Sequence, residues 1–292
     1  MTVVLMSASL RNSSCWFKAA WLLAAIFAIP ALISAQPASA EPVSFTVLTY
    51  NIRAGLGSAE PDRKPQEARG RQIDLAPVVA AIKSTNPDVV ALQEVVGEAQ
   101  ARYIAAALGM SYVYARHGET YGHWWGLAVL SKFPIERHRS FPTSAGRGNT
   151  RSDLIAVVRI GTGNVTIINV HVDKDVKDGG PIRRTLANLA AIKGPMVMLG
   201  DFNARPKAPR LAPVRARFAD VAESESARGA EAVRRHPTFT RDGQAVAGAR
   251  IDYIFIDPTD LVVEAVGLVD RAHWSASDHI GVTARLTVKA RP

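Results

Sequence analysis

The chain has 292 residues, and its 35 lysines and arginines against 26 aspartates and glutamates give a formal net charge of +9 at pH 7. This basic surplus favours polyanionic partners such as nucleic acid, anionic lipid headgroups or phosphate esters, although a basic surface kept for solubility explains it equally well. The single cysteine, Cys15, excludes an intrachain disulfide and a site built from several thiolates, which leaves metal chemistry to oxygen and imidazole ligands.

The first 40 residues have the pattern of a secretory signal peptide. Arg11 and Lys18 precede an apolar stretch at 19–34, and Ala38-Ser39-Ala40 has the small-x-small form that signal peptidase accepts. We therefore predict a signal peptide at 1–40 and export to the periplasm or the outside of the cell. The alternative is an uncleaved membrane anchor, but the apolar stretch is shorter than the ~20 residues that a spanning helix needs.

The remainder, residues 41–292, is predicted to form one domain. Its length lies in the range where an α/β sandwich or barrel forms a single unit with a sizeable core. Because Cys15 lies inside the predicted signal peptide, the exported protein would contain no cysteine nucleophile and no thiolate zinc site.

Strands and helices alternate at the start of this domain. The spacing of apolar and β-branched residues predicts a strand at 45–50, then a helix with apolar residues at helical spacing over 73–82 that ends near Asn86-Pro87. A strand at 88–93, a helix at 99–108 that stops at Gly109, and strands at 112–115, 127–131 and 154–160 are predicted next. A strand, a helix and a strand therefore come first, and several strands follow.

The second half begins with a hairpin signal. Gly161-Thr-Gly-Asn164 separates the strand at 154–160 from another at 165–171 and predicts an antiparallel pair. A helix at 181–192, with proline in its first turn, leads to a strand at 196–199. We expect loops with one short helix at 204–248 and closing strands at 250–256, 262–268 and 280–288. Hairpins mixed with crossovers predict stacked sheets covered by helices, not a parallel doubly wound sheet.

Polar side chains interrupt the apolar pattern where the predicted strands end. Sites on such scaffolds are built at strand ends, and buried carboxylates need a partner or a metal. In Gly200-Asp-Phe-Asn203 a carboxylate and a carboxamide two residues apart point the same way, which suits holding a water or a metal. We interpret the whole set as a hard-oxygen metal site with two imidazoles: Asn51, Glu94, His171, Asp201, Asn203, Asp252, Asp278 and His279.

These residues lie in seven short motifs that cover nearly all of 41–292. In order they are Thr49-Tyr-Asn-Ile-Arg53, Pro87-Asp-Val-Val-Ala-Leu-Gln-Glu-Val95, Leu130-Ser-Lys-Phe-Pro-Ile135, Asn169-Val-His171, Gly200-Asp-Phe-Asn203, Arg250-Ile-Asp-Tyr-Ile-Phe255 and Ser277-Asp-His279. The series resembles the endonuclease/exonuclease/phosphatase superfamily, which contains deoxyribonuclease I, the major abasic-site endonucleases, inositol polyphosphate 5-phosphatases and neutral sphingomyelinases. The resemblance implies an α/β fold, a four-layer αββα sandwich with two mixed β-sheets flanked by helices, and divalent-metal-dependent hydrolysis of phosphate esters.

The resemblance also implies the ligands of the metal. Glu94 would be the metal-binding carboxylate, with Asn51 beside it and Asp278 near the same ion. Mg²⁺ is the expected cofactor, with Mn²⁺ or Ca²⁺ as alternatives. A single glutamate with neighbouring amides is chemically sufficient, because Mg²⁺ keeps most of its waters and takes one or two carboxylates from the protein.

The catalytic roles implied by the resemblance fall on five residues. Asp201 would orient or deprotonate the attacking water, and Asn203 would position the phosphoryl group. His279 would contact the scissile phosphate, with Asp252 behind its other ring nitrogen, and His171 would be a second histidine on the phosphate. A carboxylate behind an imidazole fixes its tautomer and favours its charged form. In-line attack by water needs no covalent intermediate.

The substrate class stays open between several phosphate esters. We predict a phosphodiesterase or nuclease that acts as a monomer, with nucleic acid as one candidate substrate. The alternatives are a phosphatase acting on lipid, sugar or inositol phosphates and a sphingomyelinase-like phosphodiesterase, which should carry an apolar rim for a bilayer. A noncatalytic phosphate-binding module is expected to lack one or more of Glu94, Asp201, Asp252 and His279, and all are present.

Other polar and aromatic residues receive a structural interpretation. Asp173, Asp175 and Asp178 are interpreted as a solvated loop beside His171, because their spacing does not fit a calcium loop. The pair Trp124-Trp125 is interpreted as packing. Three arginines are candidates for contacting phosphate, with a surface position as the alternative: Arg53, Arg147 and Arg151. Five histidines lie in no motif: His117, His123, His138, His236 and His273.

Overall fold

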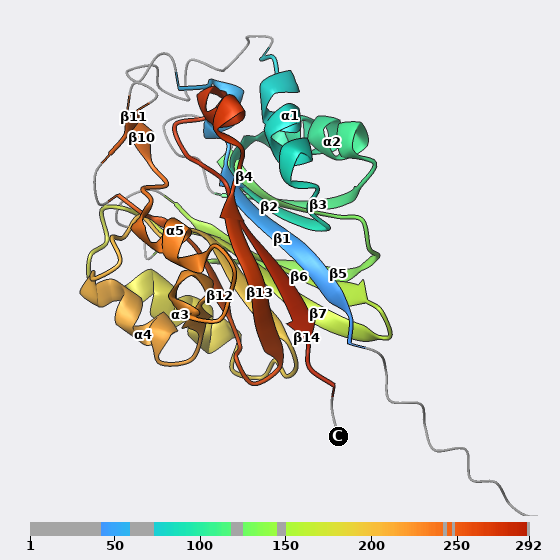
Figure 1. Ribbon diagram of the computed structural model, residues 1–292, viewed down its shortest axis with the longest axis vertical. Coiled ribbons are helices and arrows are strands. Elements are labelled where there is room, and N and C mark those ends of the chain that lie inside the picture. Colours follow the sequence, from blue (N-terminus) through green and yellow to red (C-terminus); the bar gives the residue numbers. More distant parts are fainter. Residues whose placement is uncertain are drawn as a thin grey trace, which may run out of the picture. The chain divides into compact units, whose positions relative to one another are not determined.

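The fold is that of a computed structural model, which describes residues 42–58, 73–117, 125–144, 150–241, 244–246 and 249–290 (Figure 1). All of them belong to the unit Ser39–Pro292. The predicted signal peptide at 1–40 lies outside the described residues, as do Trp124, His123 and Arg147. Among the described residues, no helix has both the length and the apolar character needed to cross a membrane.

The first sheet has six strands in the order β13-β14-β1-β2-β4-β3. At its centre β1 (Ser44–Asn51) and β2 (Val89–Val96) run parallel, and the other neighbouring strands pair antiparallel. Helix α1 (Ala76–Thr85) lies between β1 and β2 in the chain, and α2 (Gly97–Leu108) follows β2. The remaining strands are β3 (Ser111–Arg116), β4 (Trp125–Ser131), β13 (Leu261–Leu268) and β14 (Val282–Val288).

The second sheet also has six strands, in the order β5-β6-β7-β8-β12-β9. Strands β7 (Gly163–His171) and β8 (Met196–Asp201) run parallel, with α3 (Gly180–Asn188) between them in the chain. The other neighbours pair antiparallel, including the predicted hairpin of β6 with β7. The remaining strands are β5 (Ile135–Pro142), β6 (Ser152–Ile160), β9 (Ala219–Asp220) and β12 (Asp252–Ile256).

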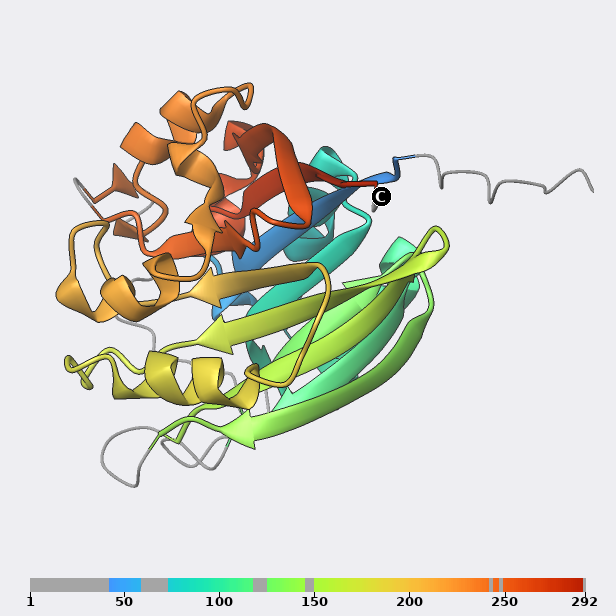
Figure 2. The same cartoon turned by 90° about the horizontal axis from the view of Figure 1, so that it is seen from below.

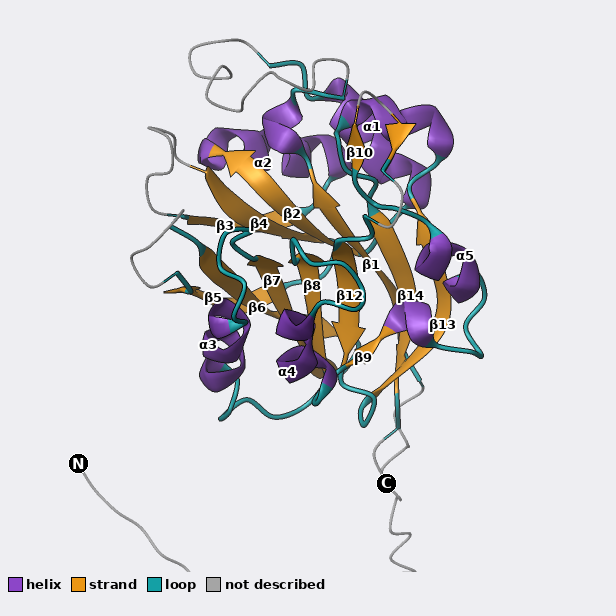
Figure 3. Cartoon of the chain, turned by 90° about the vertical axis from the view of Figure 1, so that its left-hand side faces the viewer, coloured by secondary structure: helices purple, strands orange, loops and turns teal. Residues whose placement is uncertain are grey.

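The two sheets stack face to face with helices on both outer faces, as Figures 2 and 3 show. Successive strand residues face opposite ways, so Val47 of β1 packs between the sheets while Leu48 packs under α1 and α2. In β8, Leu199 likewise joins the cluster between the sheets, and Met198 joins the one under α3 and α4 (Ala212–Arg215). Three apolar clusters between four layers confirm the predicted αββα sandwich.

Most predicted strands, and the helix predicted at 99–108, are present within a few residues of their expected bounds. Helix α1 begins at Ala76 instead of 73, because the Asp74 side chain accepts the Ala76 amide at 2.9 Å. It ends as predicted, at Thr85 before Asn86, whose φ is 42°. The helix predicted at 181–192 ends at Asn188, and the backbone tightens into turns after it.

Two regions differ from the prediction. Strand β5 was not expected, because it lies at the edge of its sheet and most of its side chains are exposed, which removes the apolar pattern of a strand. Residues 204–248 contain more than one short helix. They form α4, α5 (Ala230–Arg235), β9, the ribbon of β10 (Thr240–Arg241) with β11 (Gln244–Ala245), and the turns η3 (Pro209–Leu211) and η4 (Val221–Glu223).

Gly200 allows β7 and β8 to approach each other at the level of the predicted site. Its φ is 150°, and an added Cβ would lie 1.9 Å from the carbonyl oxygen of Val170. We expect Gly200→Ala to destabilise the fold by roughly 3 kcal/mol, because the clash is with backbone that cannot move without breaking the sheet. Urea unfolding monitored by circular dichroism measures the change.

The matched control is Gly163→Ala in β7, where an added Cβ would meet only the Ile160 carbonyl oxygen at 4.0 Å. Equal unfolding midpoints for the two variants would contradict the role given to Gly200.

Candidate active site

Strand register brings the predicted site residues to one end of the two sheets. His171 at the end of β7 is in register with Asp201 at the end of β8, and Asp252 at the start of β12 is in register with Asp201 on its other side. In the first sheet Asn51 ends β1 opposite Gln93, the residue before Glu94. The carboxyl ends of parallel strands meet at the same edge of a sheet, which explains why residues far apart in the sequence lie close together.

Asp201 lies at the centre of this arrangement and is 2% exposed. Asn51 donates from Nδ2 to Asp201 Oδ2 at 3.2 Å and so links the two sheets. Asn203 donates its backbone amide to Oδ1 at 2.8 Å and its Nδ2 to Oδ2 at 3.3 Å. Burial raises the pKa of Asp201 to about 7, with His279 acting in the opposite direction.

His279 and Asp252 form a buried imidazole–carboxylate pair. His279 Nδ1 lies 2.9 Å from Asp252 Oδ2, and His279 Nε2 lies 3.8 Å from Asp201 Oδ2. Burial lowers the pKa of His279, but the charges of Asp252, Asp201 and Asp278 outweigh it, so the pKa lies well above 6.5. With Nδ1 bound to the carboxylate, Nε2 of a charged ring is a donor that faces the centre of the site.

His171 has the opposite charge preference. Its Nε2 lies 3.5 Å from Asp201 Oδ2 and 3.9 Å from Glu94 Oε1. Burial lowers the pKa of His171 well below 6.5, and the neighbouring Arg151, His117 and His279 lower it further. The site therefore holds one histidine that favours its charged form and one that favours its neutral form.

Glu94 owes its orientation to an irregularity in β2. The register with β4 shifts between Leu92 and Val95, and Glu94 has a φ of 54°, which turns its side chain out of the regular pleat. Gln93 holds this bend, because it donates from Nε2 to Asn169 Oδ1 at 2.8 Å. The Glu94 side chain is 15% exposed, and burial followed by the charge of Asp278 raises its pKa.

Asp278 lies at the rim of the site and is paired with a guanidinium group. Arg53 Nε lies 3.4 Å from Asp278 Oδ2, and the Asp278 side chain is 25% exposed. The preceding Ser277 donates its hydroxyl to the carbonyl oxygen of Asn51 at 2.7 Å, which ties this loop to the end of β1. Of the three arginines weighed from the sequence, Arg53 and Arg151 are buried, with 4% and 5% exposure.

The donor set at this end of the sheets fits a divalent cation. Four carboxylates lie close enough to interact electrostatically: Glu94 with Asp278, and Asp201 with Asp252 and Glu94. Asp252 Oδ1 is buried and has no hydrogen-bond partner within the described part of the chain. Atoms of Asp201, Asp252 and His279 lie within 4.8 Å of one another and could hold an ion. These three residues differ from the metal ligands expected from the sequence, which were Asn51, Glu94 and Asp278.

Sequence reasoning missed His117, which follows β3 and is 1% exposed beside His171. Its burial arises from packing between the sheets, and no local pattern reveals it.

The interpretation of Asp173 as a solvated residue is wrong, because Asp173 is fully buried and accepts the Asp175 amide at 2.9 Å. Arg210 encloses it by donating to the Asp173 and Val176 carbonyl oxygens. Asp175 and Asp178 are exposed, as expected.

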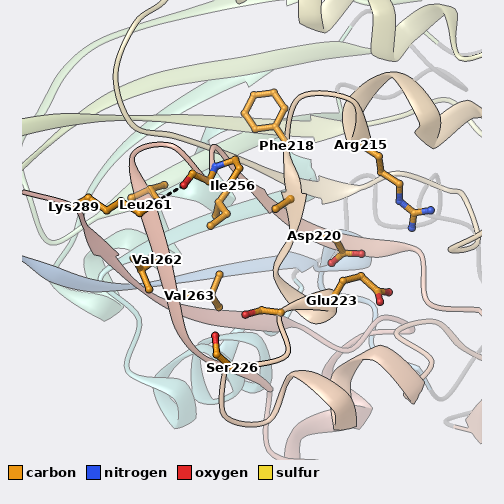
Figure 4. A pocket seen from close by; sticks show the side chains of 13 residues that line it. Arg215, Phe218, Asp220, Glu223, Ser226, Ile256, Leu261, Val262, Val263 and Lys289 are labelled. Atoms are coloured by element: carbon orange, nitrogen blue, oxygen red, sulfur yellow. Dashed lines mark hydrogen bonds between the residues drawn. The ribbon is translucent and has the colours of Figure 1, made fainter. Parts of the chain in front are cut away.

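A pocket of about 500 Å³ lies elsewhere, along β9, β12 and β13 (Figure 4). Its walls carry apolar side chains such as Ile256 and Val263 with Arg215, Glu223 and Lys289 around them. None of the predicted site residues lines it. The chemistry-bearing residues thus gather at the strand ends and not in this pocket.

Comparison with known proteins identifies one family. A model described as "Endonuclease/Exonuclease/phosphatase family" matches residues 48–279. No curated protein sequence matches the chain significantly.

Solved structures with the same fold include three that illustrate its range. A family protein from Bacteroides thetaiotaomicron has 21% identity and a TM-score of 0.67, over 86% of this chain and 97% of that one. A mannosyl-6-phosphatase from Bacteroides thetaiotaomicron VPI-5482 has 21% identity and a TM-score of 0.63, over 83% and 99% of the two chains. ANGEL2, a 2′,3′-cyclic phosphatase, has 15% identity and a TM-score of 0.64, over 84% and 95%. At such identities the likeness shows the fold alone.

The two imidazoles of the site are expected to titrate on opposite sides of pH 6.5 in the metal-free protein, His279 above and His171 below. Asp252→Asn should lower the pKa of His279, because it removes the charge that stabilises the imidazolium. Titration of the ring resonances by NMR measures both groups, with His171 as the internal control. An unchanged pKa of His279 in the variant would show that Asp252 does not set its charge.

Proposed function

Because this chain belongs to the endonuclease/exonuclease/phosphatase family, whose members hydrolyse phosphoesters, we propose that it is a divalent-metal-dependent phosphodiesterase or nuclease. Water attacks phosphorus in line with the leaving oxygen, and no covalent intermediate forms. The single observation that carries this proposal is the position of Asp201, which two asparagines orient while both histidines face it.

Asp201 is the group that orients or deprotonates the attacking water. Its carboxylate is held on both oxygens, by Asn51 and by Asn203, so a water bound to it has a defined position. Its pKa of about 7 is near the value at which a general base works best at neutral pH. Asn203 has the second task of positioning the phosphoryl group, and its φ of 48° aims its short side chain at the site.

The histidines stabilise the charge that develops on the phosphoryl oxygens. His279 acts as a cation held by Asp252, and His171 donates as a neutral imidazole. Donors fixed in a water-poor site need no rearrangement when charge develops, which is why such groups contribute strongly to catalysis.

Glu94, Asn51 and Asp278 would hold the metal, and Mg²⁺ is the proposed ion, with Mn²⁺ or Ca²⁺ as alternatives. A bound divalent cation supplies Lewis acidity to phosphoryl oxygens and neutralises charge. The raised pKa of Glu94 supports this placement, because a bound cation would stabilise the carboxylate that burial and the charge of Asp278 disfavour.

The basic character of the chain supports a polyanionic substrate. The net charge is +9, and the guanidinium groups of Arg53 and Arg151 lie near the site. A phosphomonoester or cyclic phosphate is the second candidate, because two proteins of the same fold are a mannosyl-6-phosphatase and a 2′,3′-cyclic phosphatase, the latter also solved with adenosine-2′,3′-vanadate. A sphingomyelinase-like activity has less support in this chain.

The proposal extends to where the enzyme works. The charged, apolar and small-residue pattern of 1–40 supports export through a signal peptide, with residues 41–292 acting as a monomer in the periplasm or outside the cell.

Asp201→Asn is expected to lower kcat/KM by about 10³-fold, because the amide keeps the shape of the carboxylate but cannot take a proton from water. The assay offers purified 41–292 with Mg²⁺ or Mn²⁺ to plasmid DNA, bis-p-nitrophenyl phosphate, p-nitrophenyl phosphate and sphingomyelin. Asp175→Asn, which changes an exposed acid, is the matched control.

The outcome of this assay separates the candidates. Cleavage of DNA and the diester supports the proposal, whereas cleavage of p-nitrophenyl phosphate alone favours a phosphomonoesterase. An Asp201→Asn variant as active as the parent would rule out the assigned mechanism.

Removal of metal with EDTA is expected to abolish hydrolysis, and Mg²⁺ to restore it. Glu94→Gln should raise the Mg²⁺ concentration needed for half-maximal activity by about tenfold or more, because an amide is a weaker ligand than a carboxylate. Titration of activity with Mg²⁺ measures the change, and Glu98→Gln on the exposed face of α2 is the control. Full activity in EDTA, or equal Mg²⁺ dependence of the two variants, would contradict the placement of the ion.

A further inference from the structure

A basic groove lies on the outer face of the second sheet, away from the residues gathered at the strand ends. It has a volume of about 470 Å³ and runs between β5, at the edge of this sheet (Figure 3), and the turns that lead from α3 into β8. Residues of β6 and β7 form its floor. The basic side chains that line it are those of Arg137, His138, Arg139 and Lys193.

The positive charge of this groove is not balanced by nearby acids. None of the residues that line the groove is acidic. Arg137 and Lys193 are exposed, and neither forms an ion pair within the described part of the chain. Exposed arginines elsewhere do pair with an acid, as Arg159 does with Glu136. Like charges that gather without a counter-ion repel one another, which favours an anionic ligand at this place.

The groove belongs to a larger basic layer that covers the second sheet. Residues 180–218 form α3, β8 and α4, and their only acid is the buried Asp201. The same segment carries many cations, which explains why the positive charge of the chain is concentrated on this side. They are Arg183, Arg184, Lys193, Arg205, Lys207, Arg210, Arg215 and Arg217.

Arginines connect the groove to the end of the sheets where the catalytic residues lie. Thr143, which follows β5, donates its amide to the carbonyl oxygen of Arg151 at 2.8 Å, and its own carbonyl oxygen accepts from Arg184 Nε. Arg151 in turn interacts electrostatically with Glu94. A chain of phosphates that leaves the groove along this path would therefore meet positive charge up to the proposed active site.

Strand register gives the distance between the groove and this site. Arg139 is in register with Ile155 of β6, and Ile155 is in register with Ile168 of β7. The rise per residue and the spacing of strands place Arg139 roughly 14 Å from His171 at the end of β7. A single phosphate bound at the active site cannot reach so far, but a nucleic acid strand of a few nucleotides can.

We infer that this groove binds the phosphate backbone of a nucleic acid strand outside the catalytic centre, through Arg137, Arg139 and Lys193. Positively charged grooves that follow the backbone are the usual means of binding single strands. Asn164 and Thr166 on the floor add polar groups for hydrogen bonds. The inference rests on the proposed function for the bond that is cleaved, but the binding itself does not depend on catalysis.

A bilayer surface fits this face less well than a nucleic acid strand. A flat array of headgroups cannot enter a groove, and firm attachment to a bilayer usually needs apolar side chains that insert. The exposed large apolar residues of the described ranges are Tyr103 and Val262, which lie on α2 and β13. Neither lines the groove.

The direct test is the binding of a fluorescein-labelled oligothymidylate of about 20 nucleotides, by fluorescence anisotropy in EDTA, where no hydrolysis is expected. The groove variant is Arg137→Gln with Lys193→Gln. The matched control is Lys83→Gln with Arg102→Gln, which removes the same charge from exposed positions on α1 and α2. All four substitutions change exposed side chains, and thermal unfolding checks that both variants are folded.

We expect the groove variant to raise Kd about tenfold or more, and the control to change it little. The slope of log Kd against log salt concentration should fall by about 1.4 in the groove variant, because each phosphate contact to a single strand contributes about 0.7. Equal losses in the two variants would show an effect of net charge alone and would overturn the inference, as would unchanged binding by the groove variant.

Two further probes distinguish the other sources of phosphate. We expect the groove substitutions to leave sedimentation with phosphatidylglycerol vesicles unchanged, and inorganic phosphate at the same total phosphate concentration not to displace the oligonucleotide. Loss of vesicle binding with oligonucleotide binding intact would overturn the inference in favour of a membrane. Displacement by inorganic phosphate would overturn it in favour of a site for a single phosphate.

The catalytic measurement separates this inference from the proposed function. With Mg²⁺ we expect the groove variant to raise KM for the oligonucleotide by about tenfold with kcat little changed, and to hydrolyse bis-p-nitrophenyl phosphate like the parent, because that substrate is too small to reach the groove. Equal losses on both substrates would overturn the inference. If the parent hydrolyses no DNA, the proposed nuclease activity fails, and binding in EDTA still decides whether the groove holds a nucleic acid strand.

Discussion

The hydrogen bond from Asn51 to Asp201 is the constraint on which the rest of the site depends. Asn51 ends β1 in one sheet and Asp201 ends β8 in the other, so the bond forms only when both strands end at the same level. The apolar cluster between the sheets sets their separation, and strand register sets the level. A shift of β8 by one residue would turn Asp201 to the opposite face of its sheet. The register of β8 therefore determines both the packing of the core and the geometry of the site.

The fold concentrates acids where water is largely excluded, and their charges have to be balanced locally. Amides donate hydrogen bonds to Asp201, the imidazolium of His279 pairs with Asp252, and the guanidinium of Arg53 pairs with Asp278. Glu94 has a raised pKa and lies against a histidine that favours its neutral form. Arg151, His279 and Asn51 stabilise the charged form of Glu94, but burial and the charge of Asp278 outweigh them, and the irregular backbone turns the Glu94 side chain out of the regular pleat. The backbone strain at Glu94 indicates a functional role, because a regular strand at this position would have a lower conformational free energy.

The sequence predicted the parts of the fold that depend on local pattern. Apolar strands such as β1, β2 and β8 were found because each side chain has a buried environment, and the polar residues at their ends stood out against that pattern. The edge strand β5 and the short elements of 204–248 lacked such a pattern. His117 and Asp173 could not be identified as buried from the sequence, because their burial comes from residues distant in the chain, among them Ser152 and Arg210. Burial that depends on tertiary packing could not be predicted from the spacing of residues along the chain.

The unlike charges of the two histidines have a physical reason. His171 lies 3.9 Å from Glu94, and His279 is held by Asp252 on the far side of Asp201. A second imidazolium beside Glu94 would repel a divalent cation bound there and weaken its affinity, since like charges in a poorly solvated site interact strongly. In the proposed mechanism, a neutral donor at His171 would contact a phosphoryl oxygen without that repulsion. The cation at His279 is stabilised by a carboxylate of its own. In the proposed site, the positive charge that acts on the phosphoryl group would therefore come from two separate sources, a cation at Glu94 and the imidazolium of His279.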